Sequence, residues 1–164
     1  MAKLFFRYGA MNSGKSTALM QVAHNYEERG MRVLILKPAV DTKGDDTVVS
    51  RLGVSRKADI CVGPNLDLFT AIQADIDQHG KLACVLVDES QFLKRAQADQ
   101  LLQITVEMEI PVITYGLRAD FNINGFEGST RLLEIAHNIE EMKTICACGR
   151  KALFNGRTVN GEFV

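Results

Sequence analysis

Residues 5–20 read FFRYGAMNSGKSTALM, and this stretch constrains the fold more than any other part of the chain. The apolar run Leu4–Arg7 predicts a short buried strand, and Thr17–Arg29 predicts a helix that ends at Gly30. The loop between them matches the pattern G-x-x-x-x-G-K-[ST] over Gly9–Ser16. The pattern requires a strand before the loop and a helix after it, and both are expected here. We therefore expect a phosphate-binding loop at the edge of a sheet.

The loop has the chemistry to hold a nucleoside triphosphate. Its glycines let the backbone curl so that successive N–H groups point at phosphate oxygens, and the helix N-terminus adds partial positive charge. Lys15 would reach the β- and γ-phosphates, and Ser16 would bind Mg²⁺. The residues expected to contact ATP are Gly9, Ala10, Met11, Asn12, Ser13, Gly14, Lys15 and Ser16. The alternative is a glycine-rich turn with a solvent-facing lysine.

Helix-like and strand-like segments alternate along the chain. Further strands are expected at Val33–Leu36, Leu82–Val87, Val112–Tyr115 and Met142–Cys146, and helices at Leu66–His79, Ala96–Met108 and Ser129–His137. Asn65 is the expected cap of the helix at 66–79, and residues 39–57 and 116–128 predict long loops. Strands separated by helices, without hairpin turns, indicate an α/β fold: a mainly parallel sheet with helices on both faces.

The last residues differ in character from the rest. Asn155-Gly156 and Asn160-Gly161 are strong hairpin turns between short strand-like pieces. The sequence therefore predicts an α/β domain at 1–142 and the beginning of a small β domain at 143–164. The sequence stops at Val164 inside a strand-like piece, and we expect the native polypeptide to continue.

Composition narrows the classes of partner. The 164 residues, 46% of them hydrophobic, suit a compact domain with a real core. A net charge of −1, from 19 basic and 20 acidic residues, gives no electrostatic footprint for nucleic acid or an anionic membrane, so we expect neither partner. No long apolar run occurs, and the four cysteines lack the density of a disulfide scaffold. These features predict a soluble protein of a reducing cytoplasm.

The segment CVLVDESQF, residues 84–92, supplies acidic groups at the end of a second buried strand. At the carboxyl edge of a parallel sheet, Asp88 can hold Mg²⁺ directly or through water. Glu89 beside it can accept a proton from an attacking hydroxyl or water, which makes it the candidate general base. The alternative is a polar turn that follows a strand. No N-K-x-D motif for reading guanine is present, and this disfavours a GTPase.

The motifs, in their order and spacing, resemble the type II thymidine kinases, the zinc-containing family with a RecA-like α/β core. They are GAMNSGKS at 9–16, the Asp41-Thr42 pair, VLVDESQF at 85–92, YGLRADF at 115–121 and KTICACGRKA at 143–152. The resemblance runs through essentially the whole chain. It implies transfer of the γ-phosphoryl group of ATP to the 5′-hydroxyl of thymidine, giving thymidine monophosphate for DNA synthesis, with Glu89 as the base.

The resemblance also assigns contacts residue by residue. Asp88, Glu89, Ser90 and Gln91 would complete the ATP and Mg²⁺ site. Nucleoside contacts are implied for Met11, Asp41, Phe92, Leu117, Phe121 and Phe126, with Met11 at the thymine. Aromatic and aliphatic walls suit a planar pyrimidine, and simple core packing is the alternative. Lys43 stands where the family usually has arginine, and lysine lacks the bidentate fork of arginine, so no role is carried over to it.

Cys146 and Cys148 match the first half of the family's structural zinc site in its C-x-C variant. A closed zinc site needs four ligands, and no Cys or His follows Cys148. Cys61 and Cys84 lie in apolar strand-like segments. The resemblance therefore implies that a second ligand pair, and a loop that folds over thymidine, follow beyond Val164. The alternative is a pair of free or structural thiols.

The resemblance further implies a homotetramer that is inhibited by dTTP. Two other functional classes stay open. A P-loop ATPase would use hydrolysis to move something, with Arg118 and Arg131 as candidate arginine fingers. A nucleotide-binding regulatory module would need no base at all. The aromatic residues of the loop 121–126 favour the kinase, because a kinase needs an acceptor pocket that excludes water.

Overall fold

The main sheet of the chain is built from six strands. The computed structural model describes residues 2–10, 14–39, 47–49, 55–118 and 126–145, with the short pieces 151–152, 158–159 and 162–163. The strands of the sheet are β1 (Leu4–Tyr8), β2 (Val33–Pro38), β5 (Ile60–Val62), β6 (Cys84–Val87), β7 (Val112–Gly116) and β8 (Asn138–Glu141). Their order is β5-β2-β6-β7-β1-β8, and every neighbouring pair is parallel. The predicted α/β class with a mainly parallel sheet is confirmed.

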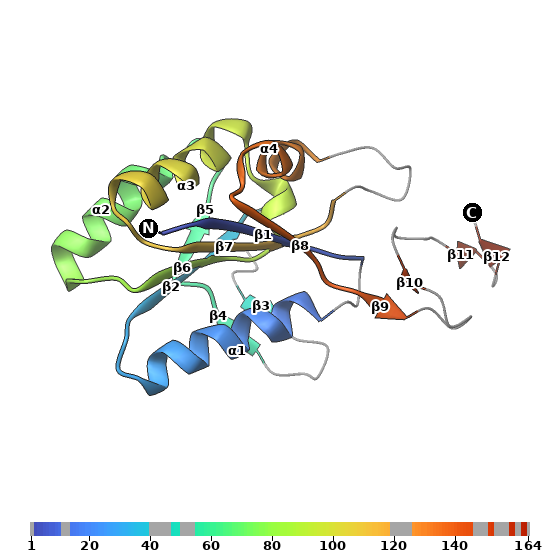
Figure 1. The fold of residues 1–164 in the computed structure, drawn as a ribbon, viewed down its shortest axis with the longest axis horizontal. Helices are drawn as coiled ribbons and strands as arrows, with labels where there is room; N and C mark the ends of the chain where they lie inside the picture. Colours follow the sequence, from blue (N-terminus) through green and yellow to red (C-terminus); the bar gives the residue numbers. More distant parts are fainter. Residues whose placement is uncertain are drawn as a thin grey trace.

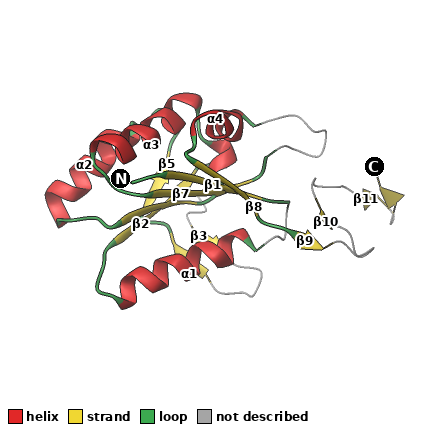
Figure 2. Cartoon of the chain, viewed as in Figure 1, coloured by secondary structure: helices red, strands yellow, loops and turns green. Residues whose placement is uncertain are grey.

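Four α-helices cover the two faces of this sheet. Helix α1 (Lys15–Glu28) lies on one face, and α2 (Leu68–His79), α3 (Arg95–Glu107) and α4 (Glu127–Ile135) lie on the other (Figure 1). Helices and strands of the main sheet largely alternate along the described chain, as Figure 2 shows. A parallel sheet needs such crossover helices, because parallel neighbours cannot be joined by tight turns.

Alternation of side chains along the strands divides the core into two clusters. Leu34 and Leu36 of β2 point into an apolar cluster with residues of α2, α3 and α4. Val33 and Ile35 of the same strand join a second cluster, which includes Leu19 of α1. A strand period of two places successive side chains on opposite faces, so both faces of β2 are buried. This explains why its sequence is continuously apolar rather than alternating.

Several helix and strand boundaries differ from the sequence-based expectations. Asp67, not Asn65, caps α2, because its Oδ1 accepts a hydrogen bond from the Thr70 N–H at 2.9 Å. The expected loop 39–57 contains an antiparallel strand pair, β3 (Thr47–Val49) and β4 (Ser55–Lys57). Neither strand was predicted, because each is three residues long and polar residues surround them. Strand β8 was also missed, since three of its four residues are polar.

The described C-terminal strands are short. Strand β9 (Thr144–Ile145) pairs antiparallel with β10 (Lys151–Ala152), and β11 (Thr158–Val159) with β12 (Glu162–Phe163). The predicted turn residues Asn160 and Gly161 follow β11 in the sequence and lie outside the described residues, as do Asn155 and Gly156. The expected strand Met142–Cys146 is thus reduced to Thr144–Ile145 within the described residues.

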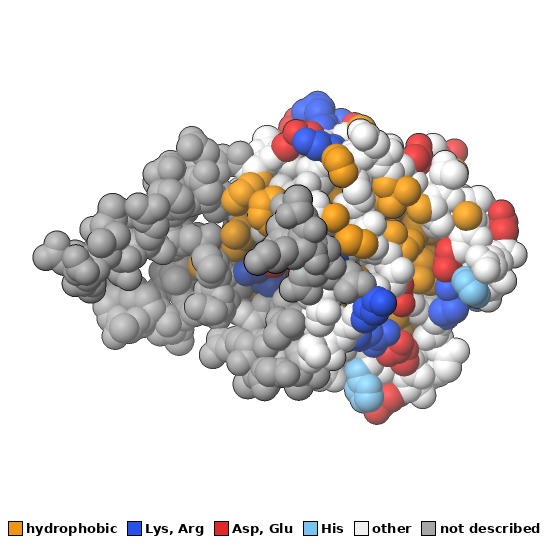
Figure 3. Space-filling model, turned by 180° about the vertical axis from the view of Figure 1, so that it is seen from behind, with side chains coloured by type: hydrophobic (Ala, Val, Ile, Leu, Met, Phe, Trp, Pro, Cys, Tyr) orange, Lys and Arg blue, Asp and Glu red, His pale blue; other side chains and the backbone are white. Residues whose placement is uncertain are grey.

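The helices and the surface charges of the protein bear on its possible contacts with a membrane or a charged partner. Among the residues that the structure describes, no helix has the length and apolar character needed to cross a bilayer. On the face shown in Figure 3, Lys and Arg side chains lie beside Asp and Glu side chains, and neither sign of charge forms a separate patch. That mixture fits the near-zero net charge of the chain.

Candidate active site

The phosphate-binding loop begins where β1 ends, beside the end of β7. The Gly9 N–H donates a hydrogen bond to the Gly116 carbonyl at 3.2 Å, so the loop leaves the sheet in a fixed direction. Gly14 has a φ of 84° and precedes the first residue of α1. This left-handed conformation suits glycine, because it lacks the Cβ that would clash. Lys15 and Ser16 then form the first turn of α1, as the motif predicted.

Lys15 folds back over the loop in this structure. Its Nζ donates to the Ala10 carbonyl at 2.8 Å and lies 3.5 Å from the Gly9 carbonyl oxygen. Burial lowers the pKa of the Lys15 ammonium, while the charges of Glu89 and Asp88 raise it. A partly desolvated ammonium gains more from an added anion than an exposed lysine would. The solvent-facing lysine of the alternative interpretation is therefore not what the structure shows.

Asp88 directly follows β6 and faces the phosphate-binding loop. Its Oδ2 accepts a hydrogen bond from the Ser16 hydroxyl at 3.3 Å, although 72 residues separate the two in sequence. Asp88 is only 3% exposed, and burial raises the pKa of its carboxyl to about 6. Glu89 raises this pKa as well, whereas the Glu89 N–H, the charge of Lys37 and Ser16 lower it. The charge of this buried carboxylate is thus incompletely balanced.

These oxygens fit a magnesium ion. A hydroxyl and a carboxylate are hard donors of the kind that Mg²⁺ prefers, together with phosphate oxygens and water. A divalent cation would also balance the charge of buried Asp88, whose raised pKa reports that imbalance. Ser16 and Asp88 are therefore the described residues whose oxygens suit such an ion.

Glu89 occupies a strained position beside Asp88. Its φ of 51° is left-handed, a conformation that non-glycine residues seldom adopt and that clusters at functional sites. The residue precedes the 3-10 helix η1 (Ser90–Phe92), and its carboxylate accepts a hydrogen bond from Gln91 Nε2 at 2.6 Å. Of the two neighbouring carboxylates, Asp88 is buried and bound by Ser16, and Glu89 is bound by Gln91.

At one side of the site, the end of β7 packs tightly against η1. Ser90 is fully buried, and its hydroxyl donates to the Tyr115 carbonyl at 3.0 Å. Gly116 leaves no room for a side chain, since a Cβ there would lie 2.6 Å from Ser90 Oγ and 2.7 Å from Gln91 Oε1. Sequence analysis did not single out Gly116. Only its place at the end of a buried strand, inside the YGLRADF landmark at 115–121, could have drawn attention to it.

An aromatic pair stands at the outer end of η1. The rings of Phe92 and Phe126 meet edge to face, with centroids 5.6 Å apart. Phe92 is 41% exposed, so core packing does not account for it. Leu117 lies close by, because its carbonyl accepts a hydrogen bond from the buried hydroxyl of Ser129 in α4. The structure thus brings together three of the predicted nucleoside contacts, and it adds Ser129, which sequence analysis missed.

Other predicted site residues lie outside the described residues. They are Met11, Asn12 and Ser13 of the loop, Asp41, Phe121, and the cysteines Cys146 and Cys148. Strands β9 and β10 pair on either side of residues 146–150, so a described antiparallel pair flanks the two cysteines. The predicted zinc site and the thymine contact of Met11 remain predictions.

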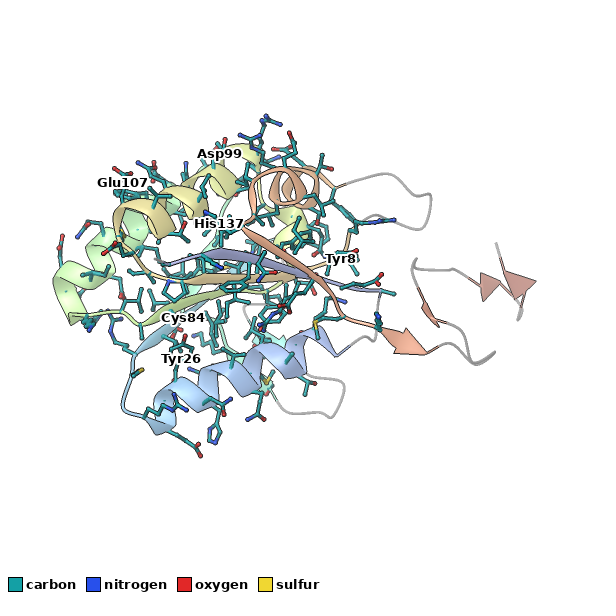
Figure 4. The ribbon with its side chains drawn as sticks, viewed as in Figure 1. Tyr8, Tyr26, Cys84, Asp99, Glu107 and His137 are labelled. Atoms are coloured by element: carbon teal, nitrogen blue, oxygen red, sulfur yellow. The ribbon has the colours of Figure 1, made fainter. Side chains whose placement is uncertain are left out.

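The remaining cysteines take no part in this edge of the sheet. Cys84 begins β6, at the opposite end of the strand from Asp88, and Tyr26 of α1 lies on the same side of the sheet (Figure 4). Burial raises the pKa of the Cys84 thiol to about 12, so it is a protonated core residue. Cys61 is exposed. Arg131, a candidate arginine finger, instead donates to Asp99 of α3 at 2.6 Å.

Comparison with known proteins agrees with this site. The family model for thymidine kinase matches residues 2–163. A thymidine kinase of Lactobacillus acidophilus is 49% identical over 170 residues, covering 99% of this chain and 84% of the relative. A thymidine kinase of Legionella pneumophila strain Paris is 49% identical, covering 100% of this chain and 79% of its own. That of Enterobacteria phage T4 is 48% identical, covering 96% and 81%. The chain is a member of the thymidine kinase family.

Proposed function

We propose that this protein transfers the γ-phosphoryl group of ATP to the 5′-hydroxyl of thymidine, giving thymidine monophosphate and ADP. The observation that carries the proposal is the meeting of Lys15 and Ser16 with Asp88 and Glu89 at one edge of the sheet. Membership of the thymidine kinase family supplies the acceptor. A second acidic residue next to the buried one is what transfer to a hydroxyl needs, because it can take the proton of that hydroxyl.

The phosphates of ATP would replace the carbonyl partners of Lys15. The ammonium then moves from Gly9 and Ala10 to phosphate oxygens, where charge accumulates during transfer. The loop N–H groups and the N-terminus of α1 add partial positive charge. When bound, Mg²⁺ neutralises phosphate charge, and Ser16 and Asp88 are the residues that would hold it.

Glu89 would orient the sugar hydroxyl and take its proton as the new P–O bond forms. A carboxylate serves this purpose when it lies within hydrogen-bond reach of the hydroxyl. The contacting rings of Phe92 and Phe126, together with Leu117, would supply an apolar wall that suits a pyrimidine and helps to exclude water. Exclusion of water matters here, since water would otherwise compete with thymidine for the phosphoryl group.

Further properties belong to the same proposal on the strength of the family resemblance. They are a structural zinc ion held in part by Cys146 and Cys148, contacts of Met11, Asp41 and Phe121 with the nucleoside, inhibition by dTTP, assembly as a homotetramer and a cytoplasmic location. The ATPase alternative is less well supported, because Arg131 is engaged by Asp99 and Arg118 lies over the ring of Tyr8.

One experiment tests the function. The protein is incubated with Mg²⁺, γ-labelled ATP and a panel of nucleosides, and the products are separated for the wild type and Glu89→Gln. We expect label in thymidine monophosphate, and a fall of about 10²- to 10⁴-fold in rate for Glu89→Gln. Label that appears only in inorganic phosphate would support the ATPase instead. Bound ATP without any turnover would support the regulatory module.

A further inference from the structure

Gln91 is buried beside Glu89, the proposed general base, and both ends of its side-chain amide form hydrogen bonds. It is 3% exposed. Its Nε2 donates to Glu89 Oε2 at 2.6 Å, and its Oε1 accepts from the Leu117 N–H at 3.2 Å. Sequence analysis assigned Gln91 to the nucleotide and Mg²⁺ site. An amide whose donor and acceptor ends are both engaged by the protein offers little to a nucleotide.

The Glu89 carboxylate and the Leu117 N–H fix the orientation of the Gln91 amide. A rotation of the amide by half a turn would set its oxygen against the Glu89 carboxylate and its NH₂ group against the Leu117 N–H. Both contacts would be repulsive, because they pair acceptor with acceptor and donor with donor. Gly116 adds a steric restraint, since Gln91 Oε1 occupies the space that a Cβ at 116 would need. Gln91 is therefore held in a single orientation.

Leu117 is held from a second side as well. Its N–H is bound by Gln91 of η1, and its carbonyl accepts from Ser129 of α4. Phe126, the residue before α4, contacts Phe92 of η1. The main chain of Leu117 thus connects the proposed nucleoside pocket to Gln91, the side chain that binds the general base Glu89.

We propose that Gln91 is a positioning residue that holds the Glu89 carboxylate in its reactive orientation and links that orientation to Leu117. The proposal rests on the thymidine kinase function proposed above. Glu89 has a left-handed backbone, and its carboxylate accepts a hydrogen bond of 2.6 Å from the Gln91 amide. Without Gln91, the carboxylate is free to rotate, and only a fraction of the bound complexes have the base aligned.

Two variants test the donor end and the acceptor end of the Gln91 amide separately. Gln91→Met has a similar volume but neither donor nor acceptor. Gln91→Glu keeps an acceptor for the Leu117 N–H but loses the donor to Glu89. We expect kcat to fall about 10- to 100-fold in both, as for loss of a hydrogen bond to a charged group. We expect KM for thymidine to rise only in Gln91→Met. An equal KM in the two variants would overturn the link to Leu117.

Gln97→Met is the matched control. Gln97 is also 3% exposed, and its side chain binds the Gly63 and Leu66 carbonyls and the Lys94 N–H, away from the site. Its loss should lower the melting temperature and leave kcat unchanged. A fall in kcat for Gln97→Met as large as that for Gln91→Met would overturn the proposal, because general loosening would then explain both.

Two further measurements separate positioning from other roles. Equilibrium binding of ATP without thymidine should be the same for the wild type, Gln91→Met and Gln91→Glu; weakened binding would return Gln91 to the nucleotide site. In the Glu89→Gln background, single-turnover assays with labelled ATP should show almost no added effect of Gln91→Met. Fully additive losses would overturn an action through Glu89. A wild type that does not phosphorylate thymidine would instead contradict the proposed function.

Discussion

The apolar layer under α2, α3 and α4 and the carboxyl edge of the sheet use the same strands for different purposes. In the layer, residues such as Leu101 and Ile104 are fully buried among apolar side chains, and their contacts have no preferred direction. At the edge, Asp88 and Gln91 are equally buried but depend on directional hydrogen bonds. The layer stabilises the fold. The edge instead holds buried charges, and burying them costs free energy when no ligand is bound. Stability and activity should therefore respond to different substitutions.

The largest effect is expected at the edge, for Lys15→Met. Loss of the ammonium should lower kcat about 10³-fold, the scale of removing a charged group from a transition state. The melting temperature of the protein without ligands should not fall, since burial already disfavours the Lys15 charge. A labelled-ATP assay and a thermal unfolding curve measure the two quantities. A large drop in melting temperature would show that this edge also stabilises the fold.

The opposite behaviour is expected in the layer, for Leu101→Ala. Leu101 is 0% exposed in α3, and its truncation should cost about 2–5 kcal/mol of unfolding free energy through lost burial and a cavity. Urea unfolding measures this cost, and kcat at a temperature where the variant stays folded should be unchanged. Leu102→Ala, at the half-buried neighbouring position, should cost less. Similar costs at both positions would mean that the layer repacks freely.

Gly116 stands where the two regions meet, so Gly116→Ala should affect both quantities. The new Cβ would overlap Ser90 Oγ and Gln91 Oε1, which are buried and hydrogen-bonded. We expect a loss of about 1–3 kcal/mol in stability, as for other overpacked sites, together with a lower kcat. Gly63→Ala is the control, because nothing lies within 4 Å of a Cβ there. A fully active, stable Gly116→Ala would contradict the tight approach of β7 to η1.

The smallest effect is expected on the surface, for Arg56→Gln. Arg56 of β4 binds both carboxylate oxygens of Glu27 in α1 at 2.6 Å, but the two side chains are 30% and 42% exposed. Such a pair contributes about 1 kcal/mol or less. Hydrogen bonding to Arg56 lowers the pKa of Glu27, so the contribution is present above the ordinary value of 4.5 and is lost as pH falls through the lowered pKa.

Urea unfolding of the wild type and Arg56→Gln at several pH values measures this contribution. The two proteins should differ at neutral pH and converge in acid. A difference that grows in acid would contradict the assigned sign.

The sequence predicted the parts of the site that depend on local pattern. Gly14, Lys15 and Ser16 form a fixed motif, and Asp88 follows a continuous apolar run that could only be a buried strand. Residues 138–141 were missed as a strand, because polar side chains at a sheet edge carry no hydrophobic period. The partners of Gln91 and Ser129 could not be predicted either. Both bind Leu117, and this contact depends on how η1, β7 and α4 pack in space.

The position of β1 in the sheet has a consequence for how the protein is made. Strand β1 lies between β7 and β8, although it leaves the ribosome well before either of them. Leu4 pairs with Val112, so β1 has no neighbour until 108 further residues have been synthesised. At about 5–20 residues per second, that delay is roughly 5–20 s. Strands β2, β5 and β6 can associate with one another during this interval. The apolar residues of β1 stay exposed until β7 is synthesised, so β1 is a segment that a chaperone would protect.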